Sequence, residues 1–205
     1  MASEIAIEGT IIPGVGRFRY LGSIMHEDRE IDEDINHRIK VGWQKWKNTS
    51  GILCDRRIPL RLKGRVYRMV VRPALLYGAE CWPIKKSQVQ RMKVAEMRMI
   101  HRMCGHTRLD KVRNEVIRSK IGVAAIEDKM REARLHWFGH IRRRSMDASV
   151  RRWETIECLD HRRHRGRPMK SWRELIRHDL KTLGLVENMA HDRKLWRVRI
   201  RVTDS

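Results

Sequence analysis

Carboxylate side chains are the first candidates for chemistry in this sequence, because they could bind a metal ion. The densest cluster is Asp32, Glu33 and Asp34. A helical hydrophobic pattern begins at the same point, and carboxylates in the first turn of a helix are stabilised by the helix dipole. A metal site would instead need several oxygen ligands held around one point. We therefore interpret this cluster as the start of a helix and not as a metal site.

Histidine and cysteine residues form two groupings that could each supply half of a zinc site, at 101–106 (H-x2-C-x-H) and 158–164 (C-x2-H-x2-H). Neither grouping contains the CxxC spacing of common zinc sites. Cys104 lies on an expected apolar helix face, so we predict a free, buried thiol there. The Gly-x-Ser-x-Gly turn of α/β-hydrolases is also absent from the sequence. These side chains predict no metal, no cofactor and no catalytic residue.

Positive charge is the clearest chemical signal. The 205 residues include 46 Lys and Arg against 25 Asp and Glu, which gives a formal net charge of +21. Such an excess attracts polyanions, so nucleic acid is the expected partner and an anionic membrane surface is the alternative. No segment approaches the roughly 18 apolar residues of a membrane span, and the N-terminus lacks a signal-peptide layout. We therefore expect an intracellular, nuclear protein, with neither a membrane nor a small-molecule substrate as its partner.

The elements that would position these charges begin with strands. Residues 5–7 and 10–12 predict two short strands around a tight turn, and residues 17–24 predict a third strand interrupted at Gly22. In the stretch RFRY (17–20) arginines alternate with aromatic residues, so one strand face could meet phosphate while the other packs. The alternative is an ordinary small hairpin under a helical core.

From residue 31 onward the hydrophobic period is helical. Capping-box sequences at 87–90 and 171–174 predict two helix starts, and Pro73 should kink or split the helix that contains it. The tryptophans of the helical stripes are expected in the core, with base stacking as the alternative. The expected helices cover residues 31–46, 59–77, 87–104, 110–121, 126–144, 171–183 and 190–201.

These patterns predict a mainly α protein with four parts. An N-terminal β-hairpin region covers residues 1–30, and a helical bundle covers residues 31–144. A basic linker rich in Arg, Gly and Pro covers residues 145–168, and a small C-terminal helical pair covers residues 169–205.

Several blocks follow one another over nearly the whole chain: FRYLGS, IDEDINHRIKVGWQKWKNTSGILCD, RLKGRVYRMVVRPALLYGAECWPIKK, RLHWFGHIRRR and RGRPMKSWRELIRHDL. In this order they resemble the end of the reverse transcriptase of LINE-type (non-LTR) retrotransposons, especially the RTE-like elements of plants. The resemblance implies that FRYLGS is the primer-grip hairpin, at the border between palm and thumb. Tyr20, Leu21 and Gly22 would then hold the backbone of the growing strand's 3′ end, with Arg19 beside them. The bundle would be the thumb, packed along an RNA–DNA or DNA template–primer duplex.

The chemistry of that family needs two divalent ions held by carboxylates, including a Tyr-x-Asp-Asp pair. No Asp-Asp dipeptide occurs in this sequence. The resemblance also places the fingers, most of the palm and the endonuclease outside this chain, and Mg²⁺ would be bound by that palm. We therefore expect no cofactor and no enzymatic activity in the chain as it stands, and a full reverse transcriptase as a further partner.

The other predicted nucleic-acid contacts are basic residues at the end of the 126–144 helix and in the linker. The sequence Arg-Gly-Arg-Pro also matches the core of AT-hook peptides, whose arginines enter a narrow minor groove. Groove binding, sequence-independent phosphate binding and a solvated loop therefore stay open for the linker. The predicted contacts are Arg142, Arg143, Arg144, Arg162, Arg163, Arg165, Arg167 and Lys170.

Two further functions fit the same sequence. The chain could be a retrotransposon remnant without activity, whose hairpin is exposed and prone to aggregation. It could also be an interaction module recruited by a host, in which helix faces bind protein and the basic arm binds DNA.

Overall fold

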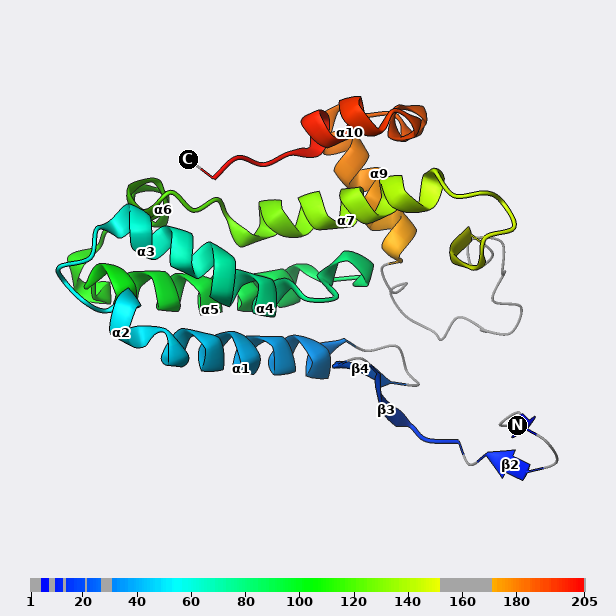
Figure 1. Cartoon of the computed structure of the whole chain (residues 1–205), viewed down its shortest axis with the longest axis horizontal. Helices are drawn as coiled ribbons and strands as arrows, with labels where there is room; N and C mark the ends of the chain where they lie inside the picture. Colours follow the sequence, from blue (N-terminus) through cyan, green and yellow to red (C-terminus); the bar gives the residue numbers. More distant parts are fainter. Residues whose placement is uncertain are drawn as a thin grey trace.

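A computed structural model of the chain describes residues 5–7, 10–12, 14–20, 22–26, 31–151 and 171–204. The fold is mainly α, as the sequence predicts. In Figure 1, strands occupy one end of the molecule, α1 runs along one edge, α5 lies in the middle, and α7 lies on the side away from α1. The C-terminal helices α9 and α10 pack on the outside of α7.

Two short antiparallel hairpins form the N-terminal part. Strand β1 (Ile5–Ile7) pairs with β2 (Thr10–Ile12), as predicted. Strand β3 (Arg17–Tyr20) pairs with β4 (Ser23–His26), which confirms the hairpin expected at FRYLGS, whereas the prediction of one interrupted strand over 17–24 was wrong. Gly22 explains the difference, because its φ of 82° suits glycine and allows the chain to reverse direction there.

The first hydrophobic core lies between α1, the helices that follow it and the first half of α7. It is formed by apolar residues such as Ile35, Leu75, Met99 and Ile126, all of which are fully buried. The helices around this core are α1 (Asp32–Asn48), α2 (Ser50–Leu53), α3 (Leu60–Val66), α4 (Arg72–Leu76), α5 (Lys86–Cys104), α6 (Asn114–Ile121) and α7 (Ile126–Arg142). Short 3₁₀ turns occur at Ala79–Cys81 and Arg108–Asp110.

Pro73 is expected to kink or split the second predicted helix, and the backbone there stays helical but changes its hydrogen-bonding pattern. Between α3 and α4 the backbone forms a π-helical turn at Tyr67–Val71. A proline donates no backbone hydrogen bond and its ring collides with the carbonyl four residues earlier. The wider π-helical turn just before Pro73 relieves this conflict while the chain continues in the same direction.

Some predicted helix starts were wrong. Helix α5 begins at Lys86, not at Ser87, because the Gln88 side-chain oxygen accepts a hydrogen bond from the Lys85 N–H at 2.7 Å. Helix α6 begins at Asn114, four residues later than predicted. The predicted stop of α5 at Gly105 is confirmed, since this residue has a φ of 70°.

The second core joins the far half of α7 to the C-terminal helices α9 (Trp172–Leu183) and α10 (Arg193–Ile200). The predicted capping box is confirmed, because Ser171 Oγ accepts from the Glu174 N–H at 3.2 Å. A 3₁₀ helix at Glu187–His191 stands where the last helix was predicted to begin. The residues of this core are Leu135, Phe138, Ile176, Leu180, Leu185, Ala190, Trp196 and Ile200.

The apolar residues of α7 recur with a helical period at Ile126, Met130, Ala133, Trp137 and Ile141, which predicts one stripe, and Ile126, Met130 and Ile141 are buried as predicted. Leu135 and Phe138 are buried, whereas Trp137 is only half-buried and stacks on His140 with 5.2 Å between the ring centroids. Because α7 packs on the bundle with its first half and on α9 and α10 with its second, the buried face changes along its length.

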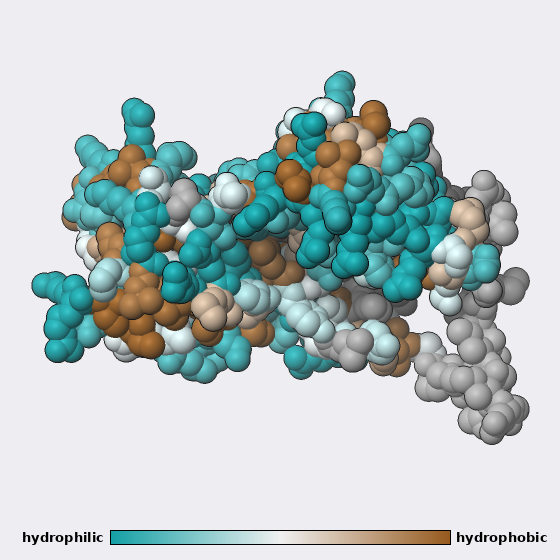
Figure 2. Space-filling model, turned by 45° about the horizontal axis from the view of Figure 1, so that its top comes forward, coloured by the Kyte–Doolittle hydropathy of each residue, from teal (hydrophilic) through white to brown (hydrophobic). Residues whose placement is uncertain are grey.

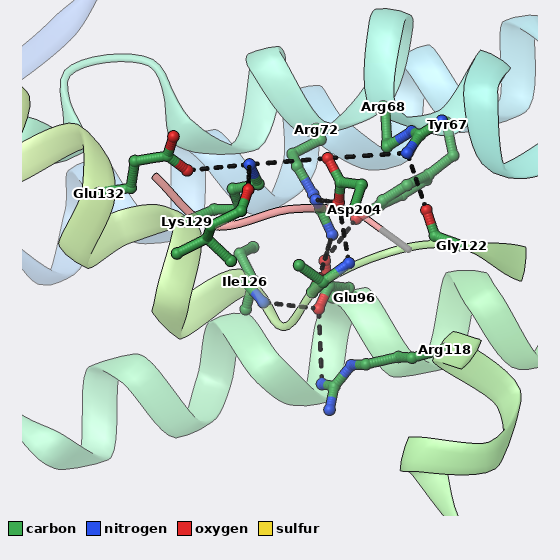
Figure 3. A network of polar contacts seen from close by, with 12 residues as sticks. Tyr67, Arg68, Arg72, Glu96, Arg118, Gly122, Ile126, Lys129, Glu132 and Asp204 are labelled. Atoms are coloured by element: carbon green, nitrogen blue, oxygen red, sulfur yellow. Dashed lines mark hydrogen bonds and ion pairs between the residues drawn. The ribbon is translucent and has the colours of Figure 1, made fainter. Parts of the chain in front are cut away.

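A buried polar network holds the middle of the bundle together (Figure 3). The fully buried Glu96 carboxylate accepts hydrogen bonds from the Tyr67 hydroxyl at 3.1 Å, Arg72 at 3.0 Å and the Ile126 N–H at 3.1 Å. These partners compensate for the removal of the charge from water. Burial, and then the Glu96 charge, raise the pKa of Tyr67 well above its ordinary value.

The same network fixes the C-terminal tail to the bundle (Figure 3). The Asp204 carboxylate accepts hydrogen bonds from the Ala124 N–H at 2.8 Å and from Arg72 at 3.0 Å. Lys129 of α7 lies 3.6 Å from Asp204 and donates to the Val202 carbonyl at 2.6 Å. Residues at the end of the chain therefore contact the first residue of α4, helix α7 and the loop before α7.

Candidate nucleic-acid interface

The β3–β4 hairpin is attached to the start of α1 by a buried arginine. Arg38 is 6% exposed, and its guanidinium donates to the Gly22 carbonyl at 2.8 Å and to Ser23 Oγ at 2.9 Å. The Asp34 carboxylate lies 3.7 Å from Arg38 and accepts a hydrogen bond from the Ile24 N–H at 3.2 Å. The turn at Gly22 is therefore fixed relative to α1.

The outer strand β3 exposes all four of its side chains. The Phe18 and Tyr20 rings are 52% and 53% exposed and stack with 6.2 Å between their centroids. The expectation that the aromatic face packs against the core was therefore wrong. Arg19 lies on the other face, with a guanidinium nitrogen 3.3 Å from His37 Nε2. Among the predicted contacts in this region, Arg19 and Tyr20 are accessible, and Leu21 lies outside the described residues.

A row of exposed polar side chains continues from the hairpin along α1. Lys40, Gln44 and Lys47 recur every three or four residues after His37, so they share one face of the helix. Burial, Arg19 and Arg38 lower the pKa of His37. Figure 1 shows α1 at the edge of the molecule, so a long ligand could contact the hairpin and this face together.

The three arginines at the end of α7 do not share one role. Arg142 lies 3.1 Å from Glu187, and Arg143 donates to the Ala190 carbonyl at 2.6 Å. These two side chains therefore hold the C-terminal helices against α7. Arg144 is exposed and makes its hydrogen bond to His140, so it is the member of the predicted cluster best placed to meet a ligand.

Helices α7 and α10 together present a basic patch, which we define as His136, His140, Arg143, Arg144, Arg193 and Arg197. Burial and the charges of Arg193 and Arg197 lower the pKa of Arg143. Burial lowers the pKa of His140 as well, and the charges of Arg144 and Arg143 lower it further. Mutual repulsion of this kind is relieved when an anion binds. The face that carries α10 is mainly hydrophilic, with a small hydrophobic area (Figure 2).

Close helix contact at Gly139 creates this patch. A Cβ atom at Gly139 would overlap the Trp196 indole and would lie 2.9 Å from the Arg143 guanidinium. The Trp196 indole N–H donates to the Leu135 carbonyl at 3.0 Å. The absence of a side chain at residue 139 therefore lets α10 approach α7 and brings two rows of basic residues together.

Sequence reasoning missed four members of the basic patch: His136, His140, Arg193 and Arg197. The sequence did contain a signal for two of them: Arg193 and Arg197 are four positions apart, so they share one face of the last predicted helix. The pairing of that face with α7 depends on tertiary contacts that the sequence pattern does not contain. The predicted contacts Arg162, Arg163, Arg165, Arg167 and Lys170 lie outside the described residues.

The acidic cluster at the start of α1 is occupied by protein partners. Asp34 accepts a hydrogen bond from the Trp82 indole at 3.1 Å, Asp32 accepts one from Gln88 at 2.8 Å, and Glu33 lies 3.2 Å from Arg17. These carboxylates point to separate partners and do not converge on one point. Within the described ranges, no group of three or more His, Cys, Asp or Glu side chains is placed to hold a metal ion.

A curated protein of Caenorhabditis elegans, whose name describes it as uncharacterized and transposon-derived, is similar to this chain. The two are 26% identical over 210 residues, which cover 94% of this chain and 72% of that protein. This similarity supports a transposon-related origin. No family model matches the chain, and no solved structure matches it. None of the described helices is long and apolar enough to cross a membrane.

Proposed function

We propose that this chain is the nucleic-acid-gripping, non-catalytic part of a LINE-type reverse transcriptase. The basic patch is the observation that carries this proposal. Six basic side chains from two helices gather there, and the charges that act on Arg143 and His140 repel them. A phosphate backbone would neutralise this charge and release its own counterions. The proposed ligand is a template–primer duplex, either RNA–DNA or DNA, inside the nucleus.

The hairpin supplies the second part of the proposed interface. Its turn is fixed by Arg38, while Tyr20 and Arg19 remain accessible on β3. This arrangement suits contact with the backbone at the end of a strand, and the exposed row on α1 suits contact with the duplex behind it. The name of the nematode relative supports an origin in a mobile element.

We further propose that the chain does not add nucleotides by itself. Its sequence contains no Asp-Asp pair, and the carboxylates at the start of α1 are held by other side chains. The two metal ions of polymerase chemistry would have to be bound by carboxylates of other residues, such as those of a full reverse transcriptase. A nucleotide-incorporation assay with Mg²⁺ and the purified chain should therefore show no activity.

Binding of a fluorescent template–primer duplex over a series of salt concentrations tests the proposal. We expect affinity to fall steeply with salt, and the double variant Arg193→Ala/Arg197→Ala to reduce the logarithmic slope by about 0.9 for each lost phosphate contact. Arg199→Ala is the matched control, because residue 199 is exposed on the opposite side of α10. Salt-independent binding, or equal weakening by the control, would contradict the proposal.

A further inference from the structure

A second basic site lies at the other end of α1 from the hairpin. The segment between α2 and α3, the first turns of α3 and the end of α5 enclose an open cavity of about 630 Å³. The α2 end of the bundle is far from the strands (Figure 1). The cavity is lined by several apolar groups and by Cys54, Arg56, Arg57, Lys63, Arg102 and Cys104.

Lys63 is the unusual member of this lining. Its side chain is only 4% exposed, and its ammonium group donates to the Met103 carbonyl at 3.0 Å. This bond satisfies a carbonyl at the end of α5, but an ammonium group has three donors. Among the described residues no carboxylate forms an ion pair with Lys63. A buried cation of this kind is stabilised by a bound anion, because burial without a counter-charge is costly.

Two arginines extend the positive charge to the mouth of the cavity. Arg102 is held with its guanidinium 5.1 Å from the centre of the Trp43 ring, and Arg56 is exposed. Within the described part of the chain, neither forms an ion pair. The nearby Asp55 carboxylate is already paired with Arg57 at 3.0 Å. Lys63, Arg56 and Arg102 therefore line the cavity without an ion pair to any carboxylate of the described residues. Hydrogen bonds from Arg57, and then the Lys63 charge, lower the pKa of Asp55, so the charge of this carboxylate is shared with Arg57.

From this geometry we propose that the cavity binds a phosphate group through Lys63, Arg56 and Arg102. The phosphate oxygens would accept from the remaining ammonium donors of Lys63 and from the two guanidinium groups, which match phosphate in shape and charge. The source is either a free phosphate or nucleotide, or the backbone of a nucleic acid. Helix α1 has 17 residues, so a strand in contact with both the hairpin and the cavity would have to span about 25 Å.

The two cysteines of the lining provide a direct readout. Cys54 is exposed and Cys104 is half-buried, and both border the cavity. We expect millimolar inorganic phosphate to slow the alkylation of both thiols by iodoacetamide several-fold, as measured by peptide mass spectrometry. Alkylation of Cys81, which does not line the cavity, should not change. Equal protection by chloride at the same ionic strength, or no protection by any phosphate compound, would overturn the proposal.

Variants connect this protection to the named cations. The double variant Arg56→Ala/Arg102→Ala should lose the protection, and circular dichroism should show an unchanged helix content. Arg65→Ala removes one exposed positive charge of α3 outside the lining and should retain the protection. Protection that persists in the double variant of a folded protein would exclude the proposed site.

The source of the phosphate is distinguished by the compounds used. Protection by inorganic phosphate or a nucleoside monophosphate identifies a free-phosphate site, and this result holds even if the duplex-binding function fails. Protection by a long template–primer duplex alone identifies the nucleic-acid backbone, and the proposal then rests on the proposed function. Duplex binding is measured separately, by fluorescence anisotropy. A failure of the phosphate site can therefore be distinguished from a failure of the proposed duplex-binding function.

Discussion

At the scale of single residues, arginine has two distinct roles in this molecule. Arg38, Arg72 and Arg134 are buried beside carboxylates and stabilise the fold. Arg144 and Arg193 are exposed and belong to the basic patch. The formal charge of +21 includes both kinds. Net charge alone therefore does not distinguish the arginines that stabilise the fold from those available to the proposed ligand.

Loss of the buried Glu96 charge should destabilise the protein strongly. The variant Glu96→Gln leaves the buried Arg72 guanidinium with one of its two counter-charges, since Arg72 lies 3.0 Å from both Glu96 and Asp204. Removal of one partner from a buried ion pair typically costs about 3–5 kcal/mol of the free energy of unfolding. Urea denaturation followed by circular dichroism measures this cost.

Glu115→Gln is the control for Glu96→Gln, because Glu115 is exposed on α6. This substitution should change the free energy of unfolding by less than about 0.5 kcal/mol. If the two variants were equally stable, the buried network would contribute little to the fold.

Docking of the C-terminal tail should depend on pH through Asp204. Burial alone would raise the pKa of this carboxyl. The hydrogen bond from the Ala124 N–H and the positive charges of Arg72, Lys129 and Arg68 outweigh the effect of burial, so the pKa of Asp204 is lower than its ordinary value. The stabilisation is therefore fully present above the ordinary aspartate pKa of about 3.9 and is lost as pH falls through the lower folded value. Asp204→Asn should be less stable than the parent at pH 7, and this difference should shrink below about pH 4. A difference in unfolding free energy that stayed constant over that range would contradict the role of Asp204.

At the scale of elements, the sequence predicted most helices because their apolar residues recur with a helical period. The stops at Gly105 and Gly184 were also predictable, because both glycines adopt a left-handed conformation that ends a helix. The strand pattern alone did not predict the reversal at Gly22, which only the resemblance implied. The start of α5 at Lys86 was not predictable either, since it depends on one side-chain hydrogen bond. Local patterns therefore predicted the elements better than their boundaries.

Close contact between α3 and α6 should make Gly64 intolerant of a side chain. A Cβ atom at this position would overlap the Ile121 carbonyl, which is backbone and cannot rotate away. We expect Gly64→Ala to lower the free energy of unfolding by at least about 1–3 kcal/mol, the usual cost of overpacking. Thermal denaturation of the variant measures the effect.

Gly51→Ala is a matched control for Gly64→Ala, because Gly51 also lies in a helix but has open space around it. Alanine there should leave stability unchanged or raise it by about 0.4–1 kcal/mol, since it restricts the unfolded chain. Equal destabilisation by both substitutions would mean that helix propensity, and not contact with α6, decides the result.

At the scale of the whole molecule, helix α7 connects the two cores and carries the basic patch on its second half. The clustering of basic residues in the sequence predicted Arg142, Arg143 and Arg144 as contacts, and Arg144 is the most accessible of the three. It could not indicate that Arg142 and Arg143 hold the C-terminal helices, because their partners Glu187 and Ala190 are more than 40 residues away in sequence. The sequence therefore indicated the end of α7 as one part of the basic patch, but it named only two of the six residues of the patch.

Because one close contact assembles the patch, Gly139→Ala should affect stability and binding together. The added methyl group would displace Trp196 and break its hydrogen bond to the Leu135 carbonyl. We expect a loss of about 1–3 kcal/mol in unfolding free energy, as for other overpacked sites. Hydrogen exchange should rise in α9 and α10, while protection in α1 to α6 persists, because the first core does not include this contact.

The duplex affinity of Gly139→Ala should fall as well, since Arg193 and Arg197 move with α10. The double variant Arg193→Ala/Arg197→Ala is the control, and it should lose duplex affinity without a rise in hydrogen exchange. If Gly139→Ala loosened α10 but bound the duplex normally, the basic patch would not be the duplex-binding surface.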